Sequence, residues 1–412
     1  MIRQKLDCRG CGNHLCNIFI DLGKSPLANS YLKKKEINKK EKIFPLKVFV
    51  CKKCYFVQLP EFENPKKIFS EYAYFSSFSS EWVAHARDYV DMITKKIKLN
   101  DKRLVMEIAS NDGYLLQFFL KKKIPVLGIE PAKNIAKVAQ KKGITTKVEF
   151  FGTKLALKLE QEGTKPDLIV ANNVLAHVPK IHDFVEGLKI ILNTNGVITI
   201  EVPHLLKLIK NIEFDTIYHE HYSYFSLNVL KDVFEKHNLT IFDVKEISTH
   251  GGSLRVFIKH EINQKIKISK NVERLLKKER EEGLQKMETY KNFEIQVNKV
   301  KNELIDFLEN AKKNKKKVIA YGAPAKGNTL LNFSNITNDL IEFTVDKNPY
   351  KQKRFLPGSH IPIKKPEMIM KTNPDFILIL PWNIKGEIIK QIKNMKKWEG
   401  KFVIPIPKLK II

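Results

Sequence analysis

The feature that most constrains this fold is an alternation of short apolar strands with helical segments. Four apolar runs have the length of buried strands: residues 103–110, 124–130, 167–173 and 196–202. Three segments between them have helical apolar spacing: residues 114–123, 132–143 and 183–192. Strands and helices that alternate in this way predict a parallel sheet with helices on both faces.

This sheet is expected to end in an antiparallel hairpin. Residues 239–248 and 253–260 are strand-like and flank His250, Gly251 and Gly252, as in a hairpin. A mostly parallel sheet that ends in a hairpin is the layout of class I methyltransferases. One fold hosts many reactions, so the side chains at the site decide which reaction occurs.

A second, smaller α/β unit is predicted further along the chain. Residues 263–316 are rich in Lys and Glu, nearly free of Gly and Pro, and expected to be helical throughout, as a connector. Strand patterns then resume at 317–323, 341–348 and 375–382. This order predicts a second doubly wound, Rossmann-like domain.

All five cysteines lie in the first 54 residues, and four of them form two CxxC pairs, Cys8 with Cys11 and Cys51 with Cys54. Four thiolates on two tight turns are the ligand set of a tetrahedral Zn²⁺. A closed shell of four thiolates indicates a structural metal, and disulfides are the alternative. Cys16 is left over, as a small core residue or a spare thiol. Any later catalytic domain lacks a thiol nucleophile.

Length and composition indicate how many domains, which kinds of partner and which cellular location to expect. At roughly 150 residues per domain, 412 residues suggest two or three domains. Lys and Arg (73) exceed Asp and Glu (45) by 28, but the lysines are scattered in short clusters. We therefore expect solvated basic faces, with no nucleic-acid or membrane partner. No apolar run approaches the ~18 residues of a spanning helix, and the first residues do not form a signal peptide, so a cytoplasmic protein is expected.

A cofactor site is predicted at the ends of the first three strands. Parallel strands bring their carboxyl ends to one edge of a sheet, where a ligand binds. Residues 107–113 contain one glycine, which argues against a GxGxxG dinucleotide loop. Glu130 stands 23 residues after Glu107 and would accept hydrogen bonds from ribose hydroxyls, although it could simply cap the next helix. In this order the signals favour S-adenosylmethionine over NAD, with these predicted contacts: Glu107, Ala109, Asn111, Asp112, Gly113, Glu130, Asn172 and Asn173.

A second candidate loop, residues 322–328, again lies between a strand and a helix. Backbone amides at a helix N-terminus, together with Lys326, suit a phosphate or diphosphate. The loop lacks the GxxxxGK[ST] pattern of nucleotide hydrolases. An ordinary glycine turn with an exposed lysine is the alternative interpretation.

Residues 214–225 contain an unusual density of aromatic and titratable side chains. His219 and His221 flank Glu220, but metal-binding histidines on a helix are spaced i, i+4 as in HExxH, so a metal is not favoured. A catalytic cluster after the strand that ends near residue 202 is the favoured interpretation, with surface polarity as the alternative. If the stretch is extended, His219 points away from His221 and is the structural histidine.

The sequence resembles the C-methyltransferases of nucleotide-linked 4-keto deoxysugars. The resemblance spans nearly the whole chain and rests on both CxxC pairs, EYAYFSSFSS, MEIASNDGYLL, FDTIYHEHYSYFS, HGGSLR, AYGAPAKGNTLLN and DFILILPWN. It implies an α/β fold with three domains: a zinc-binding domain (1–70), a class I, Rossmann-like S-adenosylmethionine methyltransferase domain (71–262), and a helical connector with a Rossmann-like nucleotide-sugar domain (263–412).

The resemblance also implies site residues. In the family the histidine that matches His221 is taken as the base, and residues matching Tyr72, His177, Tyr218 and Glu220 line its pocket. Further substrate contacts are expected from these residues: Tyr74, Tyr222, Tyr224, His250, Gly251, Lys326 and Asn328. The substrate is expected to be a dTDP-, GDP- or CDP-linked 4-keto sugar, and the protein a monomer or small homo-oligomer.

This assignment agrees with the chemistry of carbon methylation. A ketone at C4 makes the C3 proton removable, and a His, Glu and Tyr cluster supplies a base and enolate-stabilising groups without metal or thiol. A small-molecule O- or N-methyltransferase is the nearest alternative. An RNA methyltransferase fits the charge, but NNVLAHVP (172–179) is not the NPPY type. An inactive zinc-binding interaction protein is a third alternative.

Overall fold

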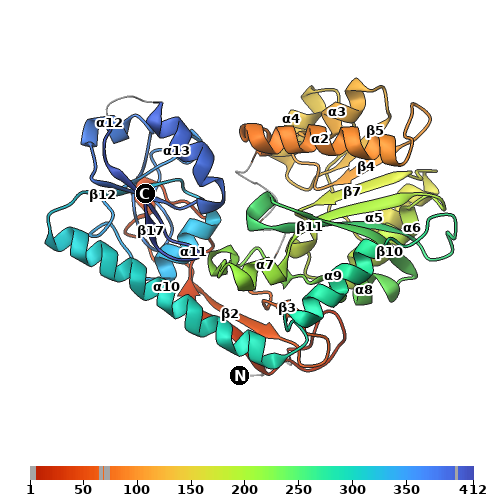
Figure 1. The fold of residues 1–412 in the computed structure, drawn as a ribbon. Helices are drawn as coiled ribbons and strands as arrows, with labels where there is room; N and C mark the ends of the chain where they lie inside the picture. Colours follow the sequence, from red (N-terminus) through yellow and green to blue (C-terminus); the bar gives the residue numbers. More distant parts are fainter. Residues whose placement is uncertain (1–5, 65–67, 69–74, 395–397) are drawn as a thin grey trace. The chain divides into compact units, whose positions relative to one another are not determined.

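The computed structural model describes residues 6–64, 68, 75–394 and 398–412. The chain forms two compact units, each assembled from separate stretches of sequence. Unit 1 comprises Met1–Cys16, Cys51–His204 and Tyr222–Gln285, and unit 2 comprises Asn17–Val50, Leu205–His221 and Lys286–Ile412 (Figure 1). The segment that ends at His221 therefore belongs to unit 2, whereas the strands before and after it belong to unit 1.

Unit 1 is built on a seven-stranded sheet of order β10-β11-β8-β7-β4-β5-β6. Its strands are β4 (Val105–Ile108), β5 (Val126–Ile129), β6 (Thr146–Lys147), β7 (Leu168–Asn172), β8 (Val197–Pro203), β10 (Leu239–Ile247) and β11 (Ser253–His260). The five strands that lie side by side as β6-β5-β4-β7-β8 are parallel. Strand β11 is antiparallel to both β8 and β10. The predicted parallel sheet that ends in a hairpin is confirmed.

Helices cover both faces of this sheet. Every residue of β4 and β7 is buried, as expected for parallel strands with helices on either side. Figure 1 shows α2 and α3 on one side and α8 and α9 on the other. The helices are α2 (Ser80–Lys96), α3 (Leu116–Lys121), α4 (Lys133–Lys141), α5 (Thr153–Gln161), α6 (Ile181–Ile191), α8 (Leu227–Glu235) and α9 (Lys270–Glu281). Ser226 caps α8 by accepting the Val229 N–H.

The rest of unit 1 is made of short elements. A two-residue ladder pairs β3 (Val57–Gln58) with β9 (Ser223–Tyr224) in antiparallel fashion. Short 3₁₀ turns occur at η2 (Ser76–Phe78), η3 (Leu175–His177) and η5 (Thr249–Gly251).

Unit 2 contains a six-stranded sheet of order β14-β13-β12-β15-β16-β17, parallel except for β17. Its strands are β12 (Val318–Tyr321), β13 (Thr344–Val345), β14 (Ile363–Lys364), β15 (Phe376–Ile379), β16 (Lys401–Ile404) and β17 (Lys410–Ile411). Its helices are α7 (Leu205–Lys210), α10 (Met287–Lys313), α11 (Ala325–Phe333), α12 (Met368–Thr372) and α13 (Lys385–Lys393), with 3₁₀ turns η1 (Lys34–Glu36), η4 (Phe214–Thr216) and η6 (Trp382–Ile384). The predicted second Rossmann-like domain is confirmed.

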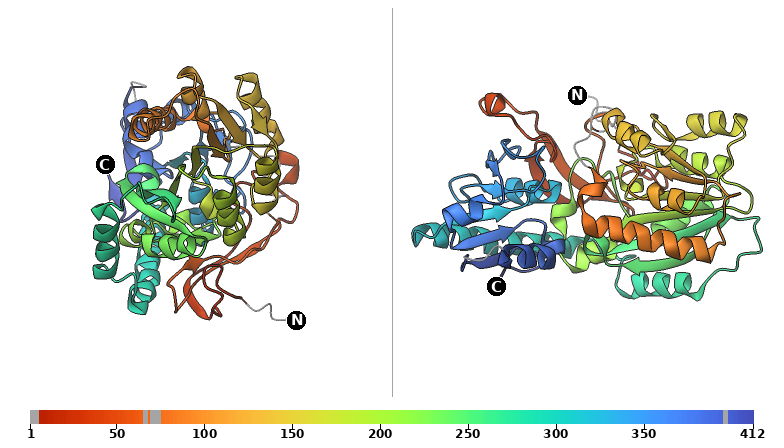
Figure 2. Two further views of the ribbon diagram at one scale, coloured as in Figure 1. Left: turned by 90° about the vertical axis from the view of Figure 1, so that its right-hand side faces the viewer. Right: turned by 90° about the horizontal axis from the view of Figure 1, so that it is seen from above.

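Two further features differ from the sequence expectation. The connector is not one continuous helix, because α9 and α10 are separated at Gly283, which has a φ of 80°. An N-terminal hairpin of β1 (Asn17–Ser25) and β2 (Phe44–Val50) joins unit 2. Phe19 of β1 stacks on Phe293 of α10 with ring centroids 4.7 Å apart; Figure 2 shows α10 in teal beside the blue strands of its unit.

Candidate active site

The four cysteines of the CxxC pairs form one cluster in unit 1. Their sulfur atoms lie within 4.8 Å of one another, with Cys8 to Cys54 and Cys11 to Cys51 both at 3.6 Å. A tetrahedral site with Zn–S bonds of about 2.3 Å separates its sulfurs by roughly 3.8 Å. The donor set therefore fits one Zn²⁺ held by four thiolates, which leaves no open position for substrate and marks the site as structural.

Each pair lies on a turn that ends in a left-handed residue. Gly12 and Tyr55 have φ values of 74° and 60°. Their N–H groups donate to the carbonyl oxygens of Cys8 and Cys51, each at 2.8 Å. Cys16 is exposed and lies outside the cluster.

The predicted cofactor loop follows β4 at the carboxyl edge of the unit 1 sheet. Ala109, Asn111 and Gly113 all have left-handed φ values, 54°, 50° and 75°. A Cβ on Gly113 would lie 2.2 Å from Ile144 Cδ1, so that side chain would have to shift, and the left-handed φ disfavours other residues at this position. A Cβ on Gly128 of β5 would similarly meet the loop at the Ser110 hydroxyl, at 2.5 Å. The loop is thus held tightly against its neighbours.

Several buried polar atoms at this edge have no hydrogen-bond partner among the described residues. They include Glu107 Oε2, Asp112 Oδ1 and both amide atoms of Asn172. Burial raises the pKa of Glu107 well above its ordinary value. Unsatisfied buried donors and acceptors are costly, and a polar ligand at this edge would satisfy them. The residues present therefore fit S-adenosylmethionine.

Glu130 follows β5 and is fixed by two backbone donors. Its Oε2 accepts the Asn111 N–H at 2.9 Å, and its Oε1 accepts the Ala132 N–H at 2.8 Å. Burial raises its pKa against these two hydrogen bonds, which lower it. Since each carboxylate oxygen accepts more than one bond, the held carboxylate can still receive ribose hydroxyls.

The end of β7 contributes a further group of candidates. Asn173 has a φ of 53° and donates from Nδ2 to His250 Nε2 at 3.1 Å. His250, with a φ of 56°, lies 5.1 Å from the Trp82 ring. Trp82 in turn stacks on Tyr114 at 5.9 Å. Sequence reasoning did not identify this aromatic wall, because Trp82 is distant in sequence from the loops that it contacts.

Sequence reasoning also missed a buried ion pair in the same unit. Arg255 Nε donates to Glu201 Oε1 at 2.7 Å, and His85 Nε2 lies 2.9 Å from Glu201 Oε2. Burial alone would raise the pKa of Glu201, but its hydrogen bond with His85 and the Arg255 charge hold it below its ordinary value. The Arg255 guanidinium also lies 4.7 Å from the Tyr89 ring. This pair ties α2 to β8 and β11.

The candidate base lies in a short loop of unit 2. His221 Nδ1 lies 2.8 Å from the Thr216 carbonyl oxygen, and its Nε2 lies 2.8 Å from the Tyr218 hydroxyl. A carbonyl can only accept, so Nδ1 carries a proton. In the neutral imidazole Nε2 is therefore the basic nitrogen, and it accepts from the Tyr218 hydroxyl. His219 instead is buried, bonds the Pro45 carbonyl at 3.2 Å and has a pKa lowered by burial.

Glu220 is buried in the same loop, with an exposed fraction of 2%. The Asn29 side-chain amide donates to both of its oxygens, at 2.7 and 2.9 Å. Asn29 comes from the segment between β1 and β2. No local sequence pattern indicates this contact, because the two residues are 191 positions apart.

The predicted phosphate loop of unit 2 has a partly internal lysine. Lys326 Nζ donates to Asn383 at 2.9 Å and lies 4.4 Å from the Trp382 ring. Burial lowers its pKa, against the nearby charges of Asp215 and Glu213. Burial raises the pKa of Asp215 to about 6 and that of Glu213 to about 7.

The other predicted contacts are distributed over both units. Asn328 of α11 donates to the Ala28 carbonyl at 2.6 Å in unit 2. In unit 1, His177 and Gly251 are half-buried in η3 and η5, and Tyr222 and Tyr224 are buried. Tyr72 and Tyr74 lie outside the described residues. The roles assigned to these residues remain predictions.

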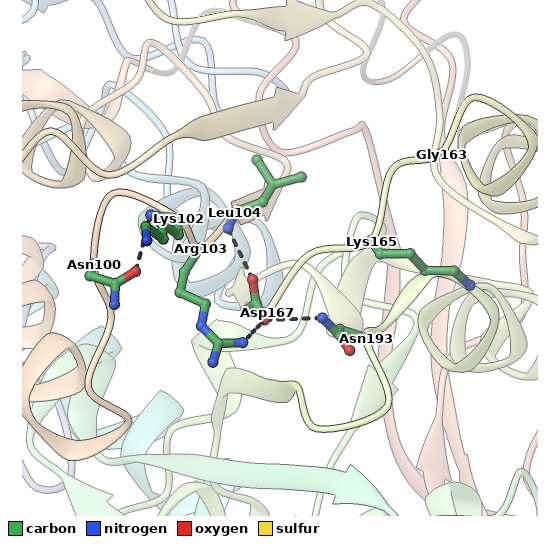
Figure 3. A pocket seen from close by; sticks show the side chains of 8 residues that line it. All are labelled: Asn100, Lys102, Arg103, Leu104, Gly163, Lys165, Asp167 and Asn193. Atoms are coloured by element: carbon green, nitrogen blue, oxygen red, sulfur yellow. Dashed lines mark hydrogen bonds and ion pairs between the residues drawn. The ribbon is translucent and has the colours of Figure 1, made fainter.

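A hollow of about 500 Å³ lies at the opposite, amino edge of the unit 1 sheet (Figure 3). Its Asp167 accepts from Arg103 at 2.6 Å, from the Leu104 N–H at 3.1 Å and from Asn193 at 3.1 Å. These bonds join the starts of neighbouring strands. None of the predicted cofactor or catalytic residues lines this hollow, and its polar groups have a structural role.

Comparison with known proteins agrees with this architecture. Residues 82–244 match the family model of a methyltransferase domain, residues 8–69 that of a zinc-binding domain, and residues 248–407 that of a C-methyltransferase C-terminal domain. Together with the sheet order, these matches define a class I, S-adenosylmethionine-dependent methyltransferase that carries a four-cysteine zinc-binding segment.

The family follows from a full-length relative. C-methyltransferase NovU from Streptomyces niveus is 34% identical over 417 residues, an alignment that covers 100% of this chain and 98% of NovU. The chain therefore belongs to the C-methyltransferase family.

Solved structures also resemble part of the chain. Magnesium protoporphyrin IX methyltransferase (ChlM) from Synechocystis PCC 6803 with bound SAM is 14% identical, covers 48% of this chain and 99% of its own, and has a TM-score of 0.36. PH0226 protein from Pyrococcus horikoshii OT3 is 12% identical with the same two coverages and a TM-score of 0.38. In the described part of the chain no helix is long and apolar enough to cross a membrane.

Proposed function

We propose that this enzyme methylates C3 of a nucleotide-linked 4-keto deoxysugar through an enolate formed by a protein base. The observation that carries the proposal is the hydrogen-bonding of His221, which keeps the proton on Nδ1 and the lone pair on Nε2. A neutral imidazole of this kind is a competent base near neutral pH. The full-length similarity to a C-methyltransferase supports transfer to carbon.

Proton removal and enolate stabilisation are assigned to the loop of Tyr218, Glu220 and His221. His221 Nε2 takes the C3 proton and becomes cationic. For this step the Tyr218 hydroxyl hydrogen turns from Nε2 to the C4 oxygen, which frees the Nε2 lone pair for the C3 proton and lets the phenol donate to the developing oxyanion, while the cationic imidazole donates toward the Tyr218 oxygen. The buried Glu220 carboxylate stabilises the cation or orients the sugar. S-adenosylmethionine, when bound, supplies the electrophilic methyl group.

The proposal assigns the cofactor to unit 1, where Glu130 receives the ribose hydroxyls and the loop of residues 109–113 surrounds the amino acid portion. It assigns the nucleotide to the C-terminal domain, residues 263–412, where Lys326 and Asn328 are the candidate contacts. The domain boundaries at 70 and 262 belong to the same proposal.

The experiment compares wild type, His221→Asn, Tyr218→Phe and the exposed-histidine control His14→Asn on a panel of dTDP-, GDP- and CDP-linked 4-keto sugars. Methylation is followed by mass, and exchange of the α-proton into D₂O is followed with S-adenosylhomocysteine present. His221→Asn should lower turnover about 10²–10⁴-fold and abolish exchange, with unchanged cofactor affinity. Tyr218→Phe should lower turnover less.

Wild-type exchange in His221→Asn would refute the base assignment. Methylation of a substrate without any C–H exchange in wild type would instead indicate an O- or N-methyltransferase. Failure with every 4-keto sugar, while other ketones are methylated, would contradict the substrate class.

A further inference from the structure

The buried Glu220 carboxylate is held by a side chain from a distant part of unit 2. Asn29 Nδ2 reaches both carboxylate oxygens, at 2.7 and 2.9 Å. Its Oδ1 lies 3.2 Å from the Tyr31 hydroxyl. A rotated amide would place a carbonyl oxygen against the carboxylate, so these neighbours fix which atom faces Glu220.

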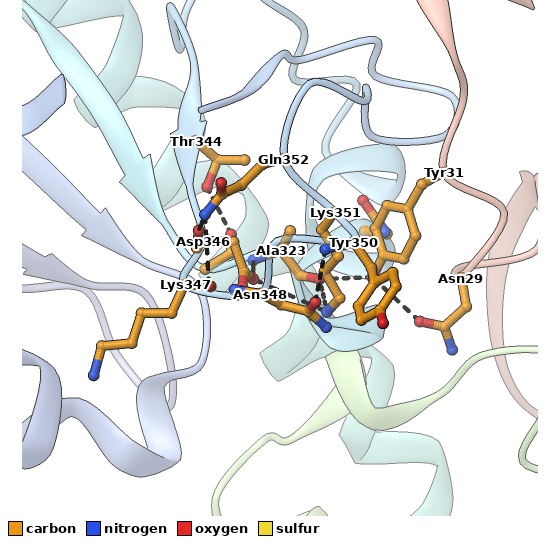
Figure 4. A network of polar contacts seen from close by, with 12 residues as sticks. Asn29, Tyr31, Ala323, Thr344, Asp346, Lys347, Asn348, Tyr350, Lys351 and Gln352 are labelled. Atoms are coloured by element: carbon orange, nitrogen blue, oxygen red, sulfur yellow. Dashed lines mark hydrogen bonds and ion pairs between the residues drawn. The ribbon is translucent and has the colours of Figure 1, made fainter. Parts of the chain in front are cut away.

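The same segment is tied to the loop after β12. The single hydrogen of the Tyr31 hydroxyl is shared between Asn29 Oδ1 and the Ala323 carbonyl oxygen, which lies 2.6 Å away, and Lys351 Nζ donates to the same carbonyl oxygen at 2.8 Å. The Ala323 N–H in turn donates to Asp346 at 2.8 Å. Figure 4 shows Asn29 and Tyr31 extending toward this network from the N-terminal segment.

Helix α11 is hydrogen-bonded both to the segment that contains Asn29 and to the loop that contains Glu220. Asn328 donates to the carbonyl of Ala28, which precedes Asn29, at 2.6 Å. Thr329 donates to the carbonyl of Ile217, three residues before Glu220, at 2.9 Å. Residues 28–31 are therefore hydrogen-bonded both to the loop that contains Glu220 and to the segment around Ala323 that precedes α11. A change in the position of one of these segments should therefore affect the other.

From this geometry we propose that Asn29 is a positioning residue that orients the Glu220 carboxylate for enolate formation, and that Tyr31 links this orientation to the loop at Ala323. The inference rests on the proposed function of the His221 loop. A buried carboxylate needs donors, and an Asn amide supplies two hydrogens with no charge. Substitution of Asn29 should therefore alter turnover rather than cofactor binding.

The sharpest test is the isosteric change Asn29→Asp, compared with Ser30→Ala, which alters the exposed neighbour. Two carboxylates at this spacing can bond only by sharing a proton. The groups facing the pair are Tyr31, with Lys351 and Asp346 beyond it, and His221 is next in sequence. The ratio of turnover in Asn29→Asp to that in Ser30→Ala should rise as pH falls from 8 to 6, because a shared proton restores a hydrogen bond across the pair.

Three readouts complete the test. Asn29→Ala should lower turnover and α-proton exchange by the same factor, about ten- to hundredfold for a lost bond to a charged group. Its Kd for S-adenosylhomocysteine should match that of Ser30→Ala. Tyr31→Phe should show a smaller loss of the same kind, and the melting temperature of Asn29→Asp should rise relative to that of the control as pH falls, because protonation of the buried carboxylate pair is linked to stability.

A turnover ratio independent of pH, or an Asn29→Ala variant as active as Ser30→Ala, would overturn the inference. So would equal losses of cofactor affinity and turnover, which indicate a purely structural role. These outcomes can be told apart from the test of His221. If His221→Asn still exchanges the α-proton, the assignment of His221 as the base is refuted. If His221→Asn is inactive and Asn29→Ala turns over normally, only the positioning role of Asn29 is refuted.

Discussion

Replacing Glu130 by glutamine should weaken cofactor binding by an amount that its surroundings set. The carboxylate is held by the Asn111 and Ala132 N–H groups, so its oxygens are already oriented when a ligand arrives. Glutamine keeps the volume but supplies one acceptor in place of two. One of the two backbone N–H groups, or one ribose hydroxyl, is then left without an acceptor.

Two contributions set the expected losses of cofactor affinity and of stability in Glu130→Gln. A hydrogen bond to a charged acceptor contributes about 1.5–3 kcal/mol, which corresponds to about a 10- to 150-fold increase in Kd for S-adenosylhomocysteine. A buried N–H without a partner costs about 1–3 kcal/mol of stability, so melting should fall by several degrees. Because burial raises the pKa of Glu130, wild-type affinity should also decline as acid protonates the carboxylate. The glutamine variant should lack that decline.

Isothermal titration with S-adenosylhomocysteine at several pH values measures both effects, and Lys137→Ala, an exposed change on α4, serves as control. Affinity for the nucleotide sugar should be unaffected. A Kd within threefold of the control would refute the ribose contact, and equal losses for both ligands would indicate misfolding.

Two further predictions concern stability. Cys51→Ser should lower zinc content and melting temperature before it alters turnover at low temperature, whereas Cys16→Ser, outside the cluster, should change neither; a metal-free protein with normal melting and activity would contradict a structural zinc. Burial raises the pKa of Glu213 from 4.5 to about 7, so its favourable contribution is present below pH 4.5 and is lost as pH rises through 7. Glu213→Gln should therefore gain up to about 3 kcal/mol over wild type at pH 8.5 and almost nothing at pH 4.5, measured by chemical unfolding; equal gains at both pH values would exclude this cause.

Much of unit 1 could be predicted because its signals are local. Four of the five parallel strands lie in predominantly apolar runs, with polar residues where the strand ends, whereas β6 (Thr146–Lys147) is two polar residues long and was not predicted. Glu107, Glu130 and Asn173 were assigned to one edge on that basis, and the topology places β4, β5 and β7 side by side. The zinc site could also be predicted from the sequence, because two CxxC pairs are typical of a structural Zn²⁺ held by four thiolates.

The rest depended on contacts between distant residues. The segment 205–221 lies between strands of unit 1 but packs in unit 2, and the hairpin of β1 and β2 lies between two stretches of unit 1 in the sequence yet contacts α10 of unit 2. No local pattern specifies such partners. Asn29 illustrates the same limit, since its hydrogen bond to Glu220 spans 191 positions.

The cofactor loop explains why a search for glycines would overlook this edge. Left-handed φ is expected to favour glycine, and a side chain there costs roughly 1–2 kcal/mol, yet Ala109 and Asn111 adopt it beside Gly113. The Asn111 N–H bond to Glu130 offsets part of that cost, because a charged acceptor bonds more strongly than a neutral one. Unit 2 uses the same device: Asp346 follows β13 and accepts the Ala323 N–H from the loop after β12 and the Asn348 N–H two residues on, both at 2.8 Å. In both units a carboxylate at the end of the neighbouring strand fixes the loop. A search of this sequence for acidic residues at strand ends therefore finds the carboxyl edges of both sheets, at Glu130 and Asp346, whereas a search for the GxGxxG pattern finds neither.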